Sequence, residues 1–345
     1  MTPVISCTIG SYNRREQLLR AIDALSASTL QEPFELCVVL DGCTDESGTA
    51  VATRFATLPS HITPILVEHP NNAGVGTAHQ SGFEHTSAPI AAFIDDDCVP
   101  DPDFLSRLLN GFSSHPTAIG YGGFIRAYSR DTFNQRFLDA TEPHRPTEAD
   151  FIGASFFTRL RLAVRPPRGI GVRSVYALVG GAMSFRRDAL AAVGGFDLAI
   201  RFGGFETRLC KSLRARFGDA SLFADPAIVV AHEFHKDLNG TFRRALRAGA
   251  AHGRDFVWRG GIPTIPPNPA FVAAAALGGL YLTPLAAVAL GMSTIAFLYG
   301  RVARGCFPEA LLYPILFCLE DGVKDVGFLL GVWRHRREWR REVVV

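Results

Sequence analysis

Residues 91–100 read AAFIDDDCVP, an apolar segment that ends in three consecutive carboxylates. The run from Pro89 to Ile94 is apolar throughout rather than alternating, which predicts a strand buried on both faces of a parallel sheet. Ligands of such sheets bind at the carboxyl ends of the strands. Adjacent carboxylates repel one another, and a divalent cation is one way to compensate their charge. The triplet Asp95–Asp97 therefore indicates a metal site, and the alternative is a solvated acidic turn.

Outward from this stretch, apolar runs alternate with segments of helical spacing. We expect strands at residues 4–9, 34–40, 62–67, 118–125, 175–185 and 227–231, of which 175–185 is interrupted by Gly180 and Gly181. We expect helices at residues 14–27, 71–85, 104–112, 207–217 and 240–256. Strands and helices that alternate at these lengths predict βαβ units. The fold class expected is α/β, with a mostly parallel central sheet of Rossmann-like type.

Composition excludes a mainly disordered protein. The chain has 345 residues, of which 48% are hydrophobic and 20% charged, so it is long and apolar enough for a large ordered domain with an appendage. Its formal charge of +2 does not indicate a nucleic-acid partner. Its seven scattered cysteines form no CxxC pair, which is typical of reduced thiols in the cytosol. The first residues resemble no cleavable signal, so the expected location is cytoplasmic.

The C-terminal third differs from the rest of the chain. No charged residue occurs from Gly260 to Gly300, and the chain closes with a basic tail at residues 334–341. Residues 311–333 predict a helix with charges on one face and apolar residues on the other, as in interfacial helices. We therefore expect a catalytic domain at 1–258 and a helical region at 259–345 on the cytoplasmic side of the cell membrane. The alternative is a buried helical subdomain.

Several short motifs follow one another in a defined order. They are SYNR at 11–14, DGCTD at 41–45, NAG at 72–74, the acidic triplet, GGA at 180–182, VGGFD at 193–197 and FGGFET at 202–207. In this order they resemble an inverting family 2 glycosyltransferase with the GT-A fold, from Val4 to about Trp258. The resemblance implies a nucleotide-sugar donor and a bound Mg²⁺ or Mn²⁺.

The resemblance assigns the donor-binding residues. Ser11, Asn13 and Asp41 would bind the nucleotide, with Asp41 accepting a hydrogen bond from the base; the alternative is that Asp41 only closes a turn. Asp95 would lie near the ribose and Asp97 would coordinate the metal, with Asp96 sharing these duties. Gly180 and Gly181 would let the backbone approach the donor sugar. Arg244 and Arg247 would lie near the diphosphate, unless they form a solvated basic face.

The resemblance also assigns one further metal ligand and the catalytic base. His232 follows the last expected strand and would be a further metal ligand, although a lone histidine is more often structural. Glu206 stands where the family commonly has the second acid of a Glu-Asp pair, which deprotonates the acceptor hydroxyl. Its alternative role is that of a charged residue at the start of a helix.

The function expected is inverting transfer of a sugar from a UDP-linked donor to an acceptor hydroxyl or phosphate. The acceptor could be a glycan, a lipid-linked molecule or a small molecule, and residues 126–171 are assigned to its side of the site or to an exposed excursion. Nucleic acid is not expected as a partner, and the oligomeric state is left open. The alternatives are a GT-A nucleotidyltransferase and a catalytically weak or inactive sugar-nucleotide-binding membrane scaffold.

Overall fold

The computed structural model describes residues 2–141, 146–148, 171–259, 309 and 312–338. These residues form two compact units. The first takes its residues from 1–128, 144–159 and 168–233, and the second from 129–143, 160–167 and 234–345.

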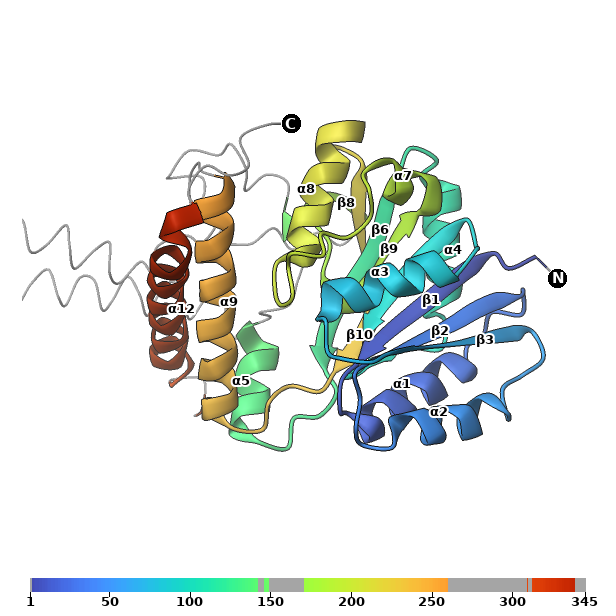
Figure 1. Cartoon of the computed structure of the whole chain (residues 1–345), viewed down its shortest axis with the longest axis horizontal. Helices are drawn as coiled ribbons and strands as arrows, with labels where there is room; N and C mark the ends of the chain where they lie inside the picture. The colour runs from blue at the N-terminus through green and yellow to red at the C-terminus, as the bar shows by residue number, and fades with distance from the viewer. Residues whose placement is uncertain (1, 142–145, 149–170, 260–308, 310–311, 339–345) are drawn as a thin grey trace, which may run out of the picture. The chain divides into compact units, whose positions relative to one another are not determined.

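The N-terminal half of the first unit is a parallel α/β sheet (Figure 1). Its strands are β1 (Ile5–Ser11), β2 (Phe34–Asp41), β3 (Ile62–His69) and β4 (Ile90–Asp95), in the order β3-β2-β1-β4. The connecting helices are α1 (Arg15–Ser26), α2 (Ser47–Phe55) and α3 (Val75–His85). The expectation of βαβ units is confirmed here, because each apolar run forms a strand parallel to its neighbours.

The other half of the sheet is mixed. The sheet continues β4-β9-β6-β10-β8-β7, through β9 (Met183–Arg186), β6 (Gly120–Ala127), β10 (Leu222–His232), β8 (Arg173–Ala177) and β7 (Thr147–Glu148). Strand β9 is antiparallel to both neighbours, β10 is parallel to β6, and β5 (Cys98–Pro100) pairs antiparallel with β10. The interruption expected at Gly180 and Gly181 within 175–185 is confirmed: a 3₁₀ turn at Gly180–Ala182 separates β8 from β9, which are two distinct strands of the sheet.

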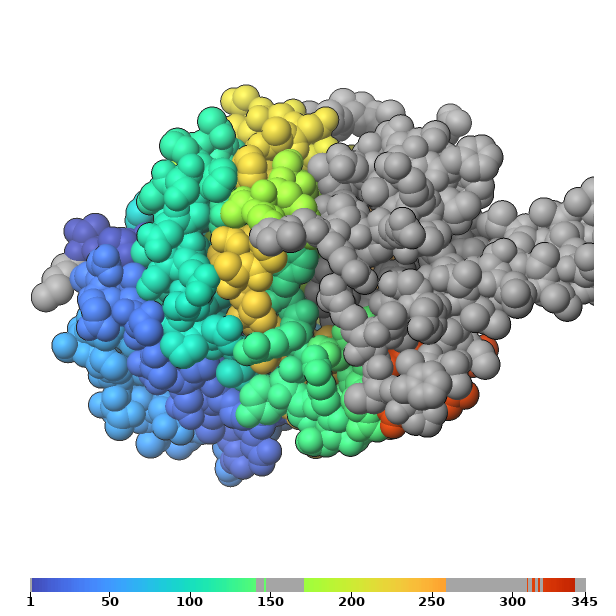
Figure 2. Space-filling view, turned by 180° about the vertical axis from the view of Figure 1, so that it is seen from behind, coloured from blue at the N-terminus to red at the C-terminus, as the bar shows by residue number. Residues whose placement is uncertain are grey.

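Helices cover both faces of the parallel half. Leu36, Val38 and Leu40 of β2 share one core cluster with residues of α1, α2 and α4 (Phe104–Ser114). Cys37 and Val39 form another cluster with Ala78 of α3. Because successive side chains of a strand point to opposite faces, the fully buried pattern of β2 follows from this sandwich. From behind, the segments coloured blue to teal form one continuous surface (Figure 2).

Close backbone packing defines the second unit. It contains α5 (Phe133–Thr141), α9 (Leu238–Arg259), α12 (Tyr313–His335) and a 3₁₀ turn at Arg336–Glu338. A Cβ added to Gly249 or Gly253 of α9 would meet backbone of α12 at 2.0 or 2.1 Å, and Gly327 and Gly331 of α12 are as tight against α9. Helix α9 therefore groups with α12 rather than with the sheet, and the division into a catalytic domain at 1–258 and a helical region at 259–345 stays a prediction. Helix α5 lies within residues 126–171, for which the sequence predicted no helix.

Some expectations for the C-terminal third cannot be compared with the structure. Among the helices described, none has the length and hydropathy needed to cross a bilayer. The uncharged stretch 260–300 and residues 339–341 of the basic tail lie outside the described residues.

Candidate functional site

An arginine partly compensates the acidic triplet at the end of β4. Buried Asp96 accepts a hydrogen bond from Ser11 Oγ at 2.7 Å and another from Arg14 Nη1 at 2.9 Å. The same Arg14 nitrogen donates to Asp97 Oδ2 at 2.7 Å. A guanidinium on the loop after β1 thus supplies part of the positive charge for which the sequence predicted a metal ion.

Arg14 compensates the negative charge of the triplet only in part. Burial, and after it the charge of Asp97, raises the pKa of Asp95 to about 7. Burial also raises the pKa of Asp96 to about 6, against the opposing effect of Arg14. For Arg14 itself, burial acts to lower the pKa, but the charges of Asp96 and Asp97 outweigh burial and raise it. A bound cation would relieve the carboxylate repulsion that remains.

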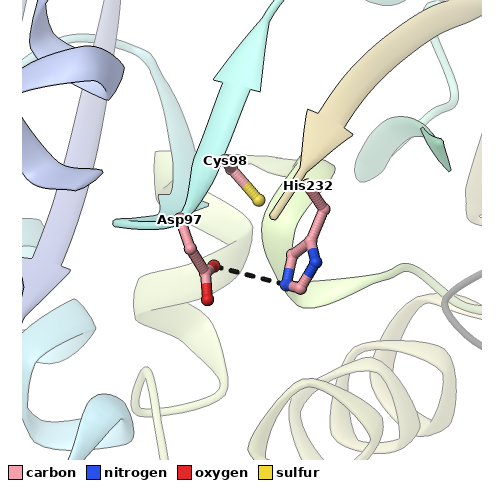
Figure 3. Close-up of side chains that lie close together, drawn as sticks. All are labelled: Asp97, Cys98 and His232. Carbon is pink, nitrogen blue, oxygen red and sulfur yellow. Dashed lines mark ion pairs between the residues drawn. The ribbon is translucent and has the colours of Figure 1, made fainter. Parts of the chain in front are cut away.

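Three different ligand types meet beside the triplet (Figure 3). His232, the last residue of β10, places Nε2 3.3 Å from Asp97 Oδ1. Cys98, the first residue of β5, contributes a thiol, and the donor atoms of the three residues lie within 4.8 Å of one another. Carboxylate and imidazole are suitable ligands for Mn²⁺, so this donor set fits a divalent ion. The structure thus brings the two predicted metal ligands, Asp97 and His232, together.

The paired glycines lie directly beside the triplet. A Cβ added to Gly181 would be 2.7 Å from Cys98 Sγ and 3.4 Å from Asp95 Oδ2. A Cβ added to Gly180 would lie 3.4 Å from the ring of Phe205 and 3.9 Å from Asp95 Oδ2. Any larger residue at Gly181 would therefore push into the ligand cluster. These two glycines therefore lie close to Asp95, and their contact with a donor sugar stays a prediction.

Glu206 occupies the first turn of α8 (Phe205–Phe217). The chain enters this helix through Gly203 and Gly204, whose φ angles of 64° and 79° favour glycine. The N-cap residue is Gly204, which has no side chain with which to cap the helix. The Glu206 Oε2 atom is buried and has no hydrogen-bond partner among the described residues. A buried polar atom without a partner costs stability, so its presence favours a functional role over a purely structural one.

Electrostatics link Glu206 to the triplet. Burial raises the pKa of Glu206, and the charge of Glu206 is one of the causes that raise the pKa of Asp95. The two carboxylates are therefore close enough to interact. The role of Glu206 as the catalytic base stays a prediction.

The carboxylate of Asp41 is occupied within the protein. It is 3% exposed and accepts backbone hydrogen bonds from Ala73 and Gly74, the shortest 2.7 Å long. His69 Nδ1 lies 2.7 Å from its Oδ1. Asp41 thus organises the loop before α3. Its hydrogen bond to a nucleotide base stays a prediction, as does the binding role of Asn13, whose Oδ1 accepts a 2.7 Å hydrogen bond from the Thr44 amide.

The predicted diphosphate arginines belong to the second unit. Arg244 of α9 donates to Glu320 of α12 at 2.8 Å, and Glu320 is only 1% exposed. Arg247 lies one turn further along the same helix. Contact of either arginine with a diphosphate stays a prediction.

Sequence reasoning missed two neighbours of the triplet. Arg14 stood in the SYNR motif without a role, and only its contacts with Asp96 and Asp97 reveal one. His79 of α3 is fully buried against Phe93, Phe196 and Phe205, and its Nε2 lies 4.0 Å from Asp95 Oδ1. Burial lowers the pKa of His79 to about 3, so the ring is neutral. Nothing in the sequence around His79 assigns it a role.

Known proteins of similar sequence and structure are sugar transferases. A glucosyl-dolichyl phosphate glucuronosyltransferase of Haloferax volcanii is 28% identical over 56% of this chain and 55% of its own length. An undecaprenyl-phosphate 4-deoxy-4-formamido-L-arabinose transferase of Yersinia enterocolitica is 28% identical over 37% of this chain and 38% of its own length. The chain thus spans about half or less of the length of these relatives.

The fold is also that of a solved sugar transferase. A mannosyltransferase from Pyrobaculum calidifontis, solved with GDP-Man and Mn²⁺, superposes with a TM-score of 0.58 at 17% identity, over 97% of this chain and 88% of the other. The family model described as glycosyl transferase family 2 matches residues 6–194, which contain the triplet, the paired glycines and most of the sheet. This match covers more than half of the 345 residues, and the chain therefore belongs to glycosyltransferase family 2.

Proposed function

We propose that this chain is an inverting, metal-dependent glycosyltransferase that uses a UDP-linked sugar donor at the cytoplasmic side of the cell membrane. The observation that carries the proposal is the convergence of Asp97, His232, Gly181 and the partnerless Glu206 oxygen around Asp95. A scaffold without activity would have no need to bury an unpaired carboxylate oxygen next to an acidic cluster.

Each residue then has a definite task. Asp97 and His232 would hold Mg²⁺ or Mn²⁺, which when bound offsets the charge that develops on the leaving diphosphate. Glu206 accepts the proton of the acceptor hydroxyl as the new bond to the sugar's anomeric carbon forms and the bond to the diphosphate breaks. Gly180 and Gly181 leave space for the donor beside Asp95. Arg14 fixes the orientation of Asp96 and Asp97 through its two ion pairs.

The relatives support a lipid-linked acceptor. The names of the Haloferax and Yersinia proteins contain the polyprenyl phosphates dolichyl phosphate and undecaprenyl phosphate. We propose the same class of acceptor for this chain, a sugar attached to a polyprenyl phosphate, whose hydroxyl is the group that Glu206 deprotonates. An acceptor of this kind is anchored in the bilayer, which agrees with the proposed location.

A panel of donors tests the proposal directly. Purified protein with Mn²⁺ should hydrolyse or transfer from one UDP-sugar faster than from the corresponding GDP- or TDP-sugars. Addition of a sugar linked to a polyprenyl phosphate should convert slow hydrolysis into transfer, with a product of inverted anomeric configuration. Binding of UDP without turnover of any donor or acceptor would instead support the scaffold.

An exposed apolar face on α12 supports the membrane location. Leu319, Val326, Leu329, Leu330 and Trp333 are 36% to 65% exposed and follow helical spacing. The buried Glu320, in contrast, pairs with Arg244 of α9, so this charged side chain lies on the packed side of α12 and the apolar ones lie outside. Arg334, Arg336 and Arg337 are exposed at its end, where they could meet anionic headgroups.

Vesicle binding should depend on this face. The double substitution Leu329→Ser and Trp333→Ser should weaken binding to anionic vesicles roughly tenfold or more, because insertion of each side chain is worth ~1.5–3 kcal/mol. Co-sedimentation with vesicles that contain phosphatidylserine measures the loss. A matched control is the pair Leu198→Ser and Phe202→Ser, whose side chains are similarly exposed in the first unit. Equal binding by both double variants would refute the role of α12.

A further inference from the structure

The proposed mechanism makes no use of Cys98, although its thiol lies in the ligand cluster. Cys98 of β5 stands directly opposite His232 of β10 in the antiparallel register. Residues that face each other in such a pair have side chains on the same face of the sheet. Figure 3 shows the Cys98 sulfur on the side of the His232 ring, with the Asp97 carboxylate beside them. Cys98 is thus placed by the register of the strands rather than by chance contact.

The sulfur is enclosed. Cys98 is fully buried, and Gly181 closes one side, since a Cβ there would be 2.7 Å from Sγ. A cation bound beside an enclosed thiol favours the thiolate form.

The spacing of the cluster is that of metal ligands. Tetrahedral ligands with metal–nitrogen and metal–oxygen bonds of ~2.0–2.2 Å are roughly 3.4 Å apart, and Asp97 Oδ1 lies 3.3 Å from His232 Nε2. A sulfur ligand with a bond of ~2.3 Å is roughly 3.5 Å from each of the others. All three donor atoms already lie within 4.8 Å of one another, so a small adjustment of side chains suffices.

We infer that Cys98 is a third protein ligand of the metal site, so that the site favours thiophilic divalent ions such as Zn²⁺, Cd²⁺ and Co²⁺ over Mg²⁺. This inference rests on the proposed function, which places the metal at Asp97 and His232. Binding forms a metal–sulfur bond, and the thiol proton passes to solvent. Soft thiolate ligands select such ions, whereas Mg²⁺ prefers oxygen ligands. Selectivity among metals would then come from one residue next to the triplet.

Titration of the full-length protein with Co²⁺ tests the inference without any activity assay. Coordinated thiolate produces a charge-transfer band in the near ultraviolet, whereas Co²⁺ bound by oxygen and nitrogen alone does not. We expect the band in the wild type, and its loss in Cys98→Ser and Cys98→Ala. The matched control is Cys37→Ala, because Cys37 is equally buried but lies in β2 with Val39 and Ala78. This control should keep the band.

Metal affinities give a second measurement. By calorimetry, the ratio of Cd²⁺ to Mg²⁺ affinity should fall roughly tenfold or more in Cys98→Ser, the scale of loss seen when a group that supports a metal site is removed. Wild-type protein that binds Co²⁺ without the band, or Cys98→Ala that keeps it, overturns the ligand role of Cys98 and leaves the metal site at Asp97 and His232 intact. Absence of any Co²⁺ binding overturns that site as well.

Discussion

Asp97→Ala is expected to abolish sugar transfer and to remove the metal dependence of donor binding. Asp97 lies 3.3 Å from His232 and is the one residue of the triplet that meets both the imidazole and Arg14. Its loss leaves the metal with too few ligands, which should lower kcat by about 10³-fold or more, since metal stabilisation of the transition state is worth several kcal/mol and each ~1.4 kcal/mol is tenfold. Steady-state kinetics with Mn²⁺ and calorimetric titration with UDP measure the two effects.

The fold should survive this substitution. Arg14 keeps its 2.9 Å ion pair with Asp96, so no buried charge is left alone. Asp103→Asn is a matched control. It removes another carboxylate nearby in sequence, whose ion pair among the described residues is with the partly exposed Arg107 within one helical turn. Such pairs contribute ~0–1 kcal/mol, and the control should transfer normally. Activity that resists both EDTA and Asp97→Ala would show that the metal assignment is wrong.

The parallel half of the fold was predictable because burial imposes a simple pattern. Strand β2 is buried at every residue, so its sequence is a continuous apolar run, and helices follow at the spacing that parallel crossovers need. The mixed half was not predictable in the same way. Strand β9 is only four residues long and is inserted antiparallel between β4 and β6, a choice made by long-range pairing rather than by local sequence.

The packing of α9 against α12 could not be predicted from the sequence either. Its sequence predicts a helix, and the structure has one. Gly249 and Gly253 lower the helix propensity of α9, but they also allow its backbone to pack closely on α12. That use of glycine depends on a partner helix more than 60 residues later in the chain. The buried Glu320 is equally dependent on Arg244, so a face that looks solvated in sequence is packed.

The site was predictable where motif and strand end coincide. Asp97 follows β4 and His232 is the last residue of β10. Because the carboxyl ends of parallel strands lie at one edge of a sheet, their meeting could be expected. Cys98 could not be singled out, because its place opposite His232 depends on the register of β5 and β10. The role of Arg14 could not be predicted for a similar reason, because its partners are more than 80 residues away in sequence.

Glu206→Gln is expected to reduce kcat by roughly 10² or more while donor KM stays nearly unchanged. Glutamine is nearly isosteric but cannot accept the acceptor's proton, and the loss of a positioned general base has this magnitude. Burial raises the pKa of Glu206, so wild-type kcat should fall as the pH drops through that raised pKa, when the base becomes protonated. The variant should lack this limb of the pH profile. Measurement of kcat against pH for both proteins tests the assignment.

Stability distinguishes a base from a helix-capping residue. A carboxylate whose pKa is raised on folding destabilises the native state above its unfolded pKa, so Glu206→Gln should keep or slightly raise Tm at neutral pH. Loss of a cap would instead cost about 1 kcal/mol and spare the chemistry. Glu206→Asp, which keeps the charge on a shorter arm, should retain part of the activity. Asp197→Asn is the control, because Asp197 already lies 3.4 Å from Arg208 and accepts a hydrogen bond from the Ala199 amide. If Glu206→Gln transfers normally with a lowered Tm while Asp197→Asn is inactive, the base is Asp197 and not Glu206.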